Sequence, residues 1–203
     1  GPVIMEANIR ALKNNITTDD VFEMVAEVSP TVSTPLVFMT YANVVYSYGI
    51  DRFFERCQDT GICGIILPDV PFEEKAEFED AAAEYGVEII SMVAPTPEDR
   101  IDKISADAKG FIYIVSSLGV TGERSKINSN IKAVVERVRK NTDVPCAVGF
   151  GISTPEQAAE MADIADGAIV GSAIVKVVSE YGKDAPQQVG KFVKSMKEAY
   201  HVS

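Results

Sequence analysis

Two glycine-containing turns carry the residues whose types and spacing suggest chemistry. The first turn, Gly149–Glu156, follows the apolar run Val144–Val148. The second, Gly171-Ser172, follows the apolar run Ala168–Val170. Glycine lets a ligand approach the backbone, and the free N–H groups and dipole of a helix N-terminus favour an anion. The first turn alone is equally consistent with an empty connection, but two such turns late in a strand–helix chain predict a phosphate site.

The end of the first turn has the signals of a helix start. Thr154 is a good N-cap residue, Pro155 suits the first helical position, and Gln157 suits the third. We therefore expect a strand to end in glycines that face the N-terminus of a helix.

Apolar runs and amphipathic segments alternate along the rest of the chain. The expected strands are Pro35–Met39, Cys63–Leu67, Glu88–Val93, Phe111–Val115, Val144–Val148 and Ala168–Val170. The expected helices are Met5–Asn14, Val21–Val28 with its cap at Thr18–Asp20, Ile50–Thr60, Glu73–Tyr85, Glu98–Ile104, Ile131–Lys140 and Ala185–Tyr200. We expect loops at Tyr41–Tyr46 and Ser116–Ser129. This alternation predicts parallel strands joined by right-handed crossovers, and hence an α/β fold.

The number of strand–helix units limits the architecture. The pattern gives six units in 203 residues, whereas a TIM (β/α)8 barrel has eight units in roughly 250 residues. We expect a single domain over residues 1–203. It is either an open, doubly wound sheet or an incomplete TIM barrel whose first two units lie outside this chain.

Composition excludes several classes of partner. A formal net charge of −11 argues against nucleic acid and anionic membranes, so an anionic substrate must be held by local N–H groups. The three cysteines, Cys57, Cys63 and Cys146, lack metal-ligand spacing and predict reduced, mostly buried thiols in the cytoplasm. From the sequence we expect neither a signal peptide nor a membrane span. The single histidine, His201, lies near the C-terminus, which argues against a metal site.

Three other features could contribute to a site. Tyr113 lies in an expected strand and could point into the barrel, or it could be an ordinary core aromatic. Asp69 lies at a strand end and could be an acid or base, or it could cap the helix that starts near Phe72. The long loop Leu118–Arg124 could cover a substrate, or it could be a surface insertion. None of these residues identifies a catalyst on its own.

Six motifs occur in the order and spacing of one protein family. The chain resembles the tryptophan synthase alpha chain over essentially all of its 203 residues, through Gly1-Pro2-Val3-Ile4, Tyr41-Ala42-Asn43, Asp69-Val70-Pro71, Gly119-Val120-Thr121-Gly122, Gly149–Gln157 and Gly171–Lys176. This resemblance implies a TIM barrel that cleaves indole-3-glycerol phosphate to indole and glyceraldehyde 3-phosphate by a retro-aldol step. It also implies a beta-chain partner that carries pyridoxal phosphate, so we expect no cofactor in this chain.

The resemblance also implies roles for particular residues. Met39 and Tyr113 would line the indole pocket, and Thr121 would orient the active-site loop. The substrate and its phosphate would be held by Gly122, Gly149, Phe150, Gly151, Gly171 and Ser172. The surface facing the beta chain would contain Asn43, Asp69, Val70 and Pro71.

The expected catalytic residues are not in this sequence. By the resemblance, the family's catalytic glutamate and aspartate precede Gly1, and the first two strands precede it as well. Gly1-Pro2 could instead be the remnant of a tag, but that would not restore the missing strands. We therefore expect a barrel with unpaired edges at the strands Pro35–Met39 and Ala168–Val170. Two other functions stay open: a catalytically silent module that binds phosphate and the beta chain, and a sugar-phosphate isomerase barrel.

Overall fold

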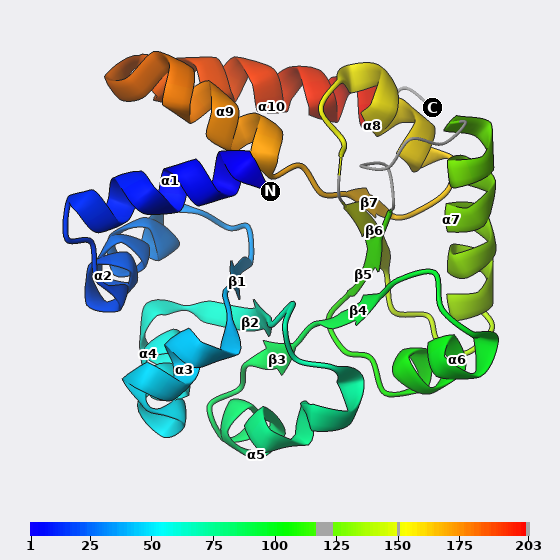
Figure 1. Cartoon of the computed structure of the whole chain (residues 1–203), viewed down its shortest axis with the longest axis horizontal. Coiled ribbons are helices and arrows are strands. Elements are labelled where there is room, and N and C mark those ends of the chain that lie inside the picture. Colours follow the sequence, from blue (N-terminus) through cyan, green and yellow to red (C-terminus); the bar gives the residue numbers. More distant parts are fainter. Residues whose placement is uncertain (117–123, 150, 202–203) are drawn as a thin grey trace.

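Strands and helices alternate after two opening helices, as the apolar pattern predicts (Figure 1). The structure is a computed structural model that describes residues 1–116, 124–149 and 151–201. The strands are β1 (Leu36–Met39), β2 (Ile62–Ile66), β3 (Glu88–Ile89), β4 (Ser91–Val93), β5 (Ile112–Val115), β6 (Cys146–Gly149) and β7 (Gly167–Ala168). The α-helices are α1 (Pro2–Lys13), α2 (Thr18–Val28), α3 (Ala42–Tyr48), α4 (Ile50–Thr60), α5 (Ala76–Glu84), α6 (Glu98–Ala106), α7 (Arg124–Val138), α8 (Pro155–Ala162), α9 (Ser172–Tyr181) and α10 (Ala185–His201).

All strand pairs are parallel, and their spatial order follows their order in the sequence. One sheet has the order β1-β2-β3 and the other has the order β4-β5-β6-β7. The expected strand Glu88–Val93 divides at Ile90, whose N–H donates to the carbonyl of Ile65 at 2.8 Å. A doubly wound sheet reverses its strand order at a switch point. This order does not reverse, so the structure has the winding of a TIM barrel.

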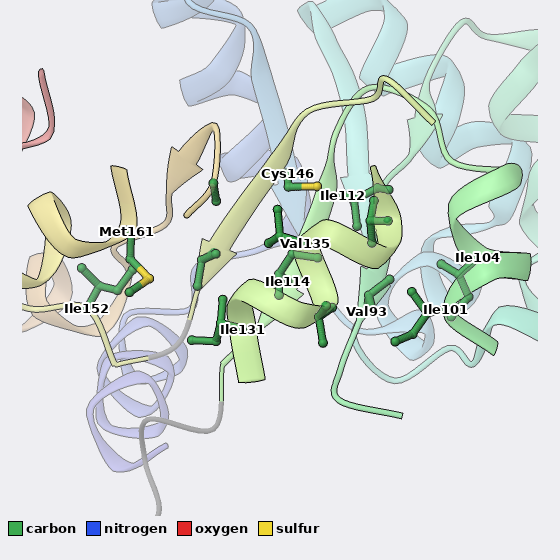
Figure 2. Packing of buried hydrophobic residues seen from close by; sticks show 14 of the residues in the cluster. Val93, Ile101, Ile104, Ile112, Ile114, Ile131, Val135, Cys146, Ile152 and Met161 are labelled. Carbon is green, nitrogen blue, oxygen red and sulfur yellow. The ribbon is translucent and has the colours of Figure 1, made fainter. Parts of the chain in front are cut away.

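Apolar side chains on the two faces of the strands form separate clusters. Figure 2 shows the outer cluster of β4, β5 and β6, to which Ile112 and Ile114 belong together with Ile101 of α6 and Val135 of α7. A second outer cluster packs β2 against α2, α4 and α5. An interior cluster faces the barrel centre and contains Ile66, Ile90 and Tyr113, with Val37, Met92, Phe111, Val115 and Ile169 against it. Because successive residues of a strand point to opposite faces, this alternation separates the structural cores from the interior where a substrate could bind.

Two expected loops are partly helical. The expectation for Tyr41–Tyr46 is wrong, because residues Ala42–Tyr48 form α3, which buries Val45 and has its first N–H group bound by the Asp69 carboxylate. The expected loop through Ser129 is also too long, because α7 begins at Arg124. At α3, the long-range contact with Asp69 outweighs a weak local helix signal.

Capping and cysteine predictions have mixed outcomes. The capping box of α2 uses Thr17 with Asp20, so the predicted cap at Thr18 is wrong by one residue. All three cysteines are free thiols, and burial raises the pKa of Cys57 to about 12 and that of Cys146 to about 11. Cys57 and Cys146 are buried and Cys63 is exposed, so the expectation of mostly buried thiols is confirmed. Within the described residues, no helix has the length and apolar character needed to cross a bilayer.

The sheet does not close. Among the described residues, β1 pairs only with β2, and β7 pairs only with β6, so one edge of each strand has no partner. In Figure 1 these strands are the two ends of an open arc, and α1 lies beside α9. The helix α1 has no buried residue and exposes Ile4, Met5, Ile9 and Leu12. The prediction of an unclosed barrel is confirmed.

We expect these surfaces to make the chain associate with itself. Unpaired edges of parallel strands and an apolar helix face both favour intermolecular contacts. Leu12 is 70% exposed on α1, so Leu12→Glu should reduce the association seen in sedimentation velocity as the concentration rises. Asn8→Glu adds the same charge to an exposed polar position of α1 and should have little effect. A monomer with one cooperative thermal transition for the unsubstituted chain would contradict this expectation.

Candidate functional site

The two glycine turns lie side by side at the carboxyl ends of the strands. The strands β5, β6 and β7 are neighbours, and Val148 of β6 is in register with Ala168 of β7. Just beyond this pair, the N–H of Ile169 donates to the carbonyl of Val148 at 2.7 Å. The next residues along each strand lead directly into Gly149–Glu156 and Gly171-Ser172. The fold therefore brings together the two turns that the sequence singled out.

The first turn ends in the predicted helix cap. The Thr154 hydroxyl accepts a hydrogen bond from the N–H of Gln157, and Pro155 is the first residue of α8. The Gln157 side-chain oxygen accepts hydrogen bonds from the N–H groups of Ser153, at 2.7 Å, and Thr154, at 3.1 Å. Gly151 supplies the left-handed backbone that the turn requires, with φ of 88°. The cap is confirmed, but it occupies two of the N–H groups that we expected an anion to use.

The second turn keeps its N–H groups available. The helix α9 begins after Gly171 with no side-chain cap and no acidic residue in its first turn. The N–H groups of Ile174 and Val175 bond the carbonyl of Gly171. Those of Ser172 and Ala173 have no acceptor among the described residues. Gly171 and Ser172 are exposed, so an anion can reach these donors at the positive end of the helix dipole.

Tyr113 depends on a glycine in the neighbouring strand. Its side chain is 4% exposed and belongs to the interior cluster, so it points inward. A Cβ atom added to Gly149 would lie 2.1 Å from the Tyr113 hydroxyl oxygen and 2.4 Å from its Cζ. Burial raises the pKa of Tyr113. Gly149 therefore leaves the space in which the Tyr113 ring lies, which adds a packing role to the predicted ligand role.

Sequence reasoning missed the contribution of Ser116. Its N–H, at 3.0 Å, and its hydroxyl, at 2.8 Å, both donate to the carbonyl of Gly149. The serine is 3% exposed and joins the carboxyl ends of β5 and β6 at the point where both loops leave the sheet. A small polar residue directly after an apolar strand is a weak signal, and only the strand register identifies its partner.

Met39 lies at the carboxyl end of β1 and is 50% exposed. It is in register with Ile66, which belongs to the interior cluster with Tyr113. Met39 therefore reaches the same end of the barrel as Tyr113, from the other sheet. Three predicted site residues, Thr121, Gly122 and Phe150, lie outside the described residues.

Asp69 holds a loop to a helix. Its two carboxylate oxygens accept hydrogen bonds from the N–H of Ala42 at 3.1 and 3.2 Å. Asp69 therefore caps α3, and the alternative that it caps the helical turn at Phe72 is wrong, because that turn has no side-chain cap. The contact joins the loop Asp69–Pro71 to the start of α3, where Asn43 is exposed. The four residues predicted to face a partner thus lie in two connected segments, with only Val70 half-buried.

The described site contains few groups that could transfer a proton. In the described parts of the strand-to-helix loops, the carboxylates are Asp69, which is engaged by Ala42, and Glu73 and Glu74 in the helical turn Phe72–Glu74 after β2. Glu73 accepts hydrogen bonds from the Arg100 guanidinium at 2.8 and 2.9 Å. No group of three histidine, cysteine, aspartate or glutamate residues among the described residues is placed to hold a metal ion. The geometry therefore provides anion donors and an apolar interior rather than an acid–base pair.

The parallel strands, their unreversed order and the site at their carboxyl ends define a TIM-barrel-type α/β protein, open between β1 and β7. A family model described as "Tryptophan synthase alpha chain" matches residues 1–202. The chain is 46% identical to the tryptophan synthase alpha chain of Lacticaseibacillus casei, over 98% of this chain and 75% of that one. The chain therefore belongs to the tryptophan synthase alpha chain family, a family of lyase subunits, and the predicted resemblance is confirmed.

Solved structures agree with this assignment. The tryptophan synthase alpha subunit of Campylobacter jejuni superposes with a TM-score of 0.88 at 34% identity, over 97% of this chain and 77% of that one. The alpha subunit from Legionella pneumophila str. Paris superposes with a TM-score of 0.88 at 35% identity, over 100% of this chain and 77% of that one. The chain thus spans about three quarters of the length of these relatives.

Proposed function

We propose that this chain binds indole-3-glycerol phosphate and acts in its retro-aldol cleavage to indole and glyceraldehyde 3-phosphate, in tryptophan biosynthesis. Membership of the family supports the reaction class. The observation that carries the proposal is the uncapped start of α9, where the N–H groups of Ser172 and Ala173 have no acceptor among the described residues. These donors suit the phosphate of the substrate.

We assign the phosphate to the second turn, with help from the first. Ser172 and Ala173 would donate their N–H groups, and the lack of a side chain at Gly171 and Gly151 would let phosphate oxygens approach the backbone. Gly122 would complete the cradle from the loop after β5, where Thr121 would orient that loop. Phe150, between the glycines of the first turn, would complete the substrate contacts.

The interior cluster would receive the indole ring. Tyr113 and Met39 supply an aromatic ring and a flexible thioether, which pack well against a flat aromatic ligand. The Tyr113 ring occupies the space that a side chain at Gly149 would fill. The substrate would therefore lie with its phosphate at α9 and its ring toward the barrel centre.

We assign binding, and not proton transfer, to the described site. Retro-aldol cleavage breaks the bond between the indole ring and the adjacent carbinol carbon, while a base removes the hydroxyl proton and an acid protonates the ring carbon. Asp69 is engaged as a helix cap, and Glu73 in the next turn is paired with Arg100. We therefore propose that this chain alone does not supply the catalytic glutamate and aspartate that the family resemblance implies.

We propose that the chain docks on a beta chain, which would carry the pyridoxal phosphate. One structure of a relative is titled "Structural basis of mutual activation of the tryptophan synthase a2b2 complex", from Pyrococcus furiosus. In this chain the loop Asp69–Pro71 is joined to the start of α3 through the Ala42 N–H, so the exposed Asn43, Asp69 and Pro71 lie beside the carboxyl ends of β1 and β2. The three free thiols support a reducing compartment, the cytoplasm.

A catalytically silent module that keeps the phosphate site and the beta-chain surface is the second candidate function. The engagement of Asp69 as a cap favours it. Both candidates predict that the chain binds sn-glycerol 3-phosphate in calorimetry without turning over indole-3-glycerol phosphate. They differ when the part of the Lacticaseibacillus casei chain that this chain does not cover is added in trans.

Restored turnover in that mixture would support the lyase. Activation of a beta chain with no turnover in any mixture would support the silent module. Turnover by this chain alone would overturn our assignment of the missing carboxylates. A folded chain that does not bind glycerol phosphate would contradict both candidates.

A further inference from the structure

An apolar cavity of about 340 Å³ lies outside the sheet, between β7 and α10. Ala168 forms its floor on the outward face of β7, and Ala158 of α8 and Ile174 of α9 line it from the neighbouring helices. The helix α10 covers it with Phe192, Met196 and Tyr200, among others. Ala168 packs with the outer cluster, whereas its neighbour Ile169 packs with the interior cluster. The cavity therefore lies on the outer side of β7, separate from the barrel interior.

The residues on α10 suit a flat aromatic ligand. Phe192 and Tyr200 present two aromatic rings, and the Met196 thioether is buried at 7% exposure. Aromatic rings and thioethers gain energy from edge-on and offset contacts with a further ring. The Tyr200 hydroxyl donates to the carbonyl of Ala165 at 2.7 Å, which holds that ring in place. Small side chains at Ala158 and Ala168 leave the room that the ligand would occupy.

Charge at the cavity favours an anionic substituent. Among the described residues, Lys197 is the only charged residue that lines the cavity. It is exposed and has no ion-pair partner among those residues. The next lysine on the same helix, Lys194, instead pairs with Glu198 at 3.7 Å. The helix carries three lysines and one glutamate, so its local charge is positive although the chain has a net charge of −11.

We propose that this cavity binds a small planar aromatic anion, with its rings between β7 and α10 and its anionic group at Lys197. The volume lies at the lower end of the roughly 300–1,000 Å³ typical of ligand sites, which suits a body of one or two fused rings. The apolar lining provides the affinity and Lys197 provides the preference for charge.

Calorimetry with 2-naphthoate and its uncharged analogue 2-naphthamide tests this proposal on the full chain. We expect 2-naphthoate to bind about fivefold more tightly than 2-naphthamide, as one exposed ion pair allows. Lys197→Gln should remove this difference. Lys194→Gln deletes the same charge one helical turn away and should leave the difference unchanged. Equal effects of the two variants would show a general charge effect and overturn the site.

A filled cavity gives the second test. Ala168→Leu should abolish the binding of both compounds while the thermal transition is retained. If this variant does not fold, the methyl resonances of Ala158 and Ala168 in the unsubstituted chain report instead, and both should shift on addition of 2-naphthoate. Three results would each overturn the proposal. The first is binding that persists in a folded Ala168→Leu chain, and the second is methyl resonances that do not shift. The third is a cavity that a second copy of the chain fills at low protein concentration.

Discussion

Gly149→Ala should lower the free energy of unfolding by about 2–3 kcal/mol, because a side chain at this position overpacks a filled region. The added Cβ would lie 2.1 Å from the Tyr113 hydroxyl oxygen and 2.5 Å from its Cε1. Tyr113 is 4% exposed, so its ring cannot turn aside without displacing the interior cluster. Stabilities of natural domains are about 5–15 kcal/mol, so this loss is large, and chemical denaturation measures it.

Two controls separate overpacking from a general effect of replacing glycine. Gly190→Ala lies within α10, and its added Cβ would meet no atom within 4 Å, so it should stabilise the chain by about 0.5–1 kcal/mol. In a Tyr113→Leu background the clashing ring atoms are absent, and Gly149→Ala should then cost much less. A double-mutant cycle reports this coupling. Additive effects of Tyr113→Leu and Gly149→Ala would contradict the packing role of Gly149.

Ser172→Asp should weaken the binding of sn-glycerol 3-phosphate at least about tenfold, which is about 1.4 kcal/mol. The substitution places a carboxylate at the first position of α9, where it would repel the phosphate and bond the same N–H groups. An acidic residue in the first turn of a helix is favourable with the dipole, and this turn has none. The folded state should therefore persist, so that calorimetry at low salt measures the loss of binding alone.

Ser172→Asn is the matched control, because asparagine has the shape of aspartate without its charge. We expect it to bind glycerol phosphate within about threefold of the unsubstituted chain, because a neutral side chain does not repel the phosphate. A threefold change corresponds to about 0.7 kcal/mol. Ser153→Asp should also have a small effect, because the Gln157 side chain already occupies the N–H of Ser153. If Ser153→Asp weakened binding more than Ser172→Asp, the phosphate would belong to the first turn.

The sequence predicts the strands and the site turns well for a physical reason. Buried parallel strands are short apolar runs, and residues such as Thr154, Pro155 and Gln157 have preferences strong enough to mark a helix start by themselves. The register of adjacent parallel strands then places Gly149–Glu156 beside Gly171-Ser172. The chemistry of the turns could therefore be predicted before their geometry was known.

The remaining features depend on contacts between distant residues. Asp69 caps α3 from 27 residues away, so neither the helix nor the role of the carboxylate is visible in either segment alone. The same holds for Ser116, which bonds Gly149 from 33 residues away. The hydrogen bonds from the N–H groups of Ser153 and Thr154 to the Gln157 side chain are local. An anion would compete with Gln157 for these donors, and only the structure shows that Gln157 occupies them.

Amide NMR of the unsubstituted chain, titrated with sn-glycerol 3-phosphate, tests the central claim most directly. The claim is that the phosphate of the substrate binds at the start of α9. We predict that the amide protons of Ser172 and Ala173 move downfield in a saturable manner, and that those of Ser153 and Thr154 move far less. Unchanged Ser172 and Ala173 resonances in a folded chain, or larger shifts at Ser153 and Thr154, would contradict this account.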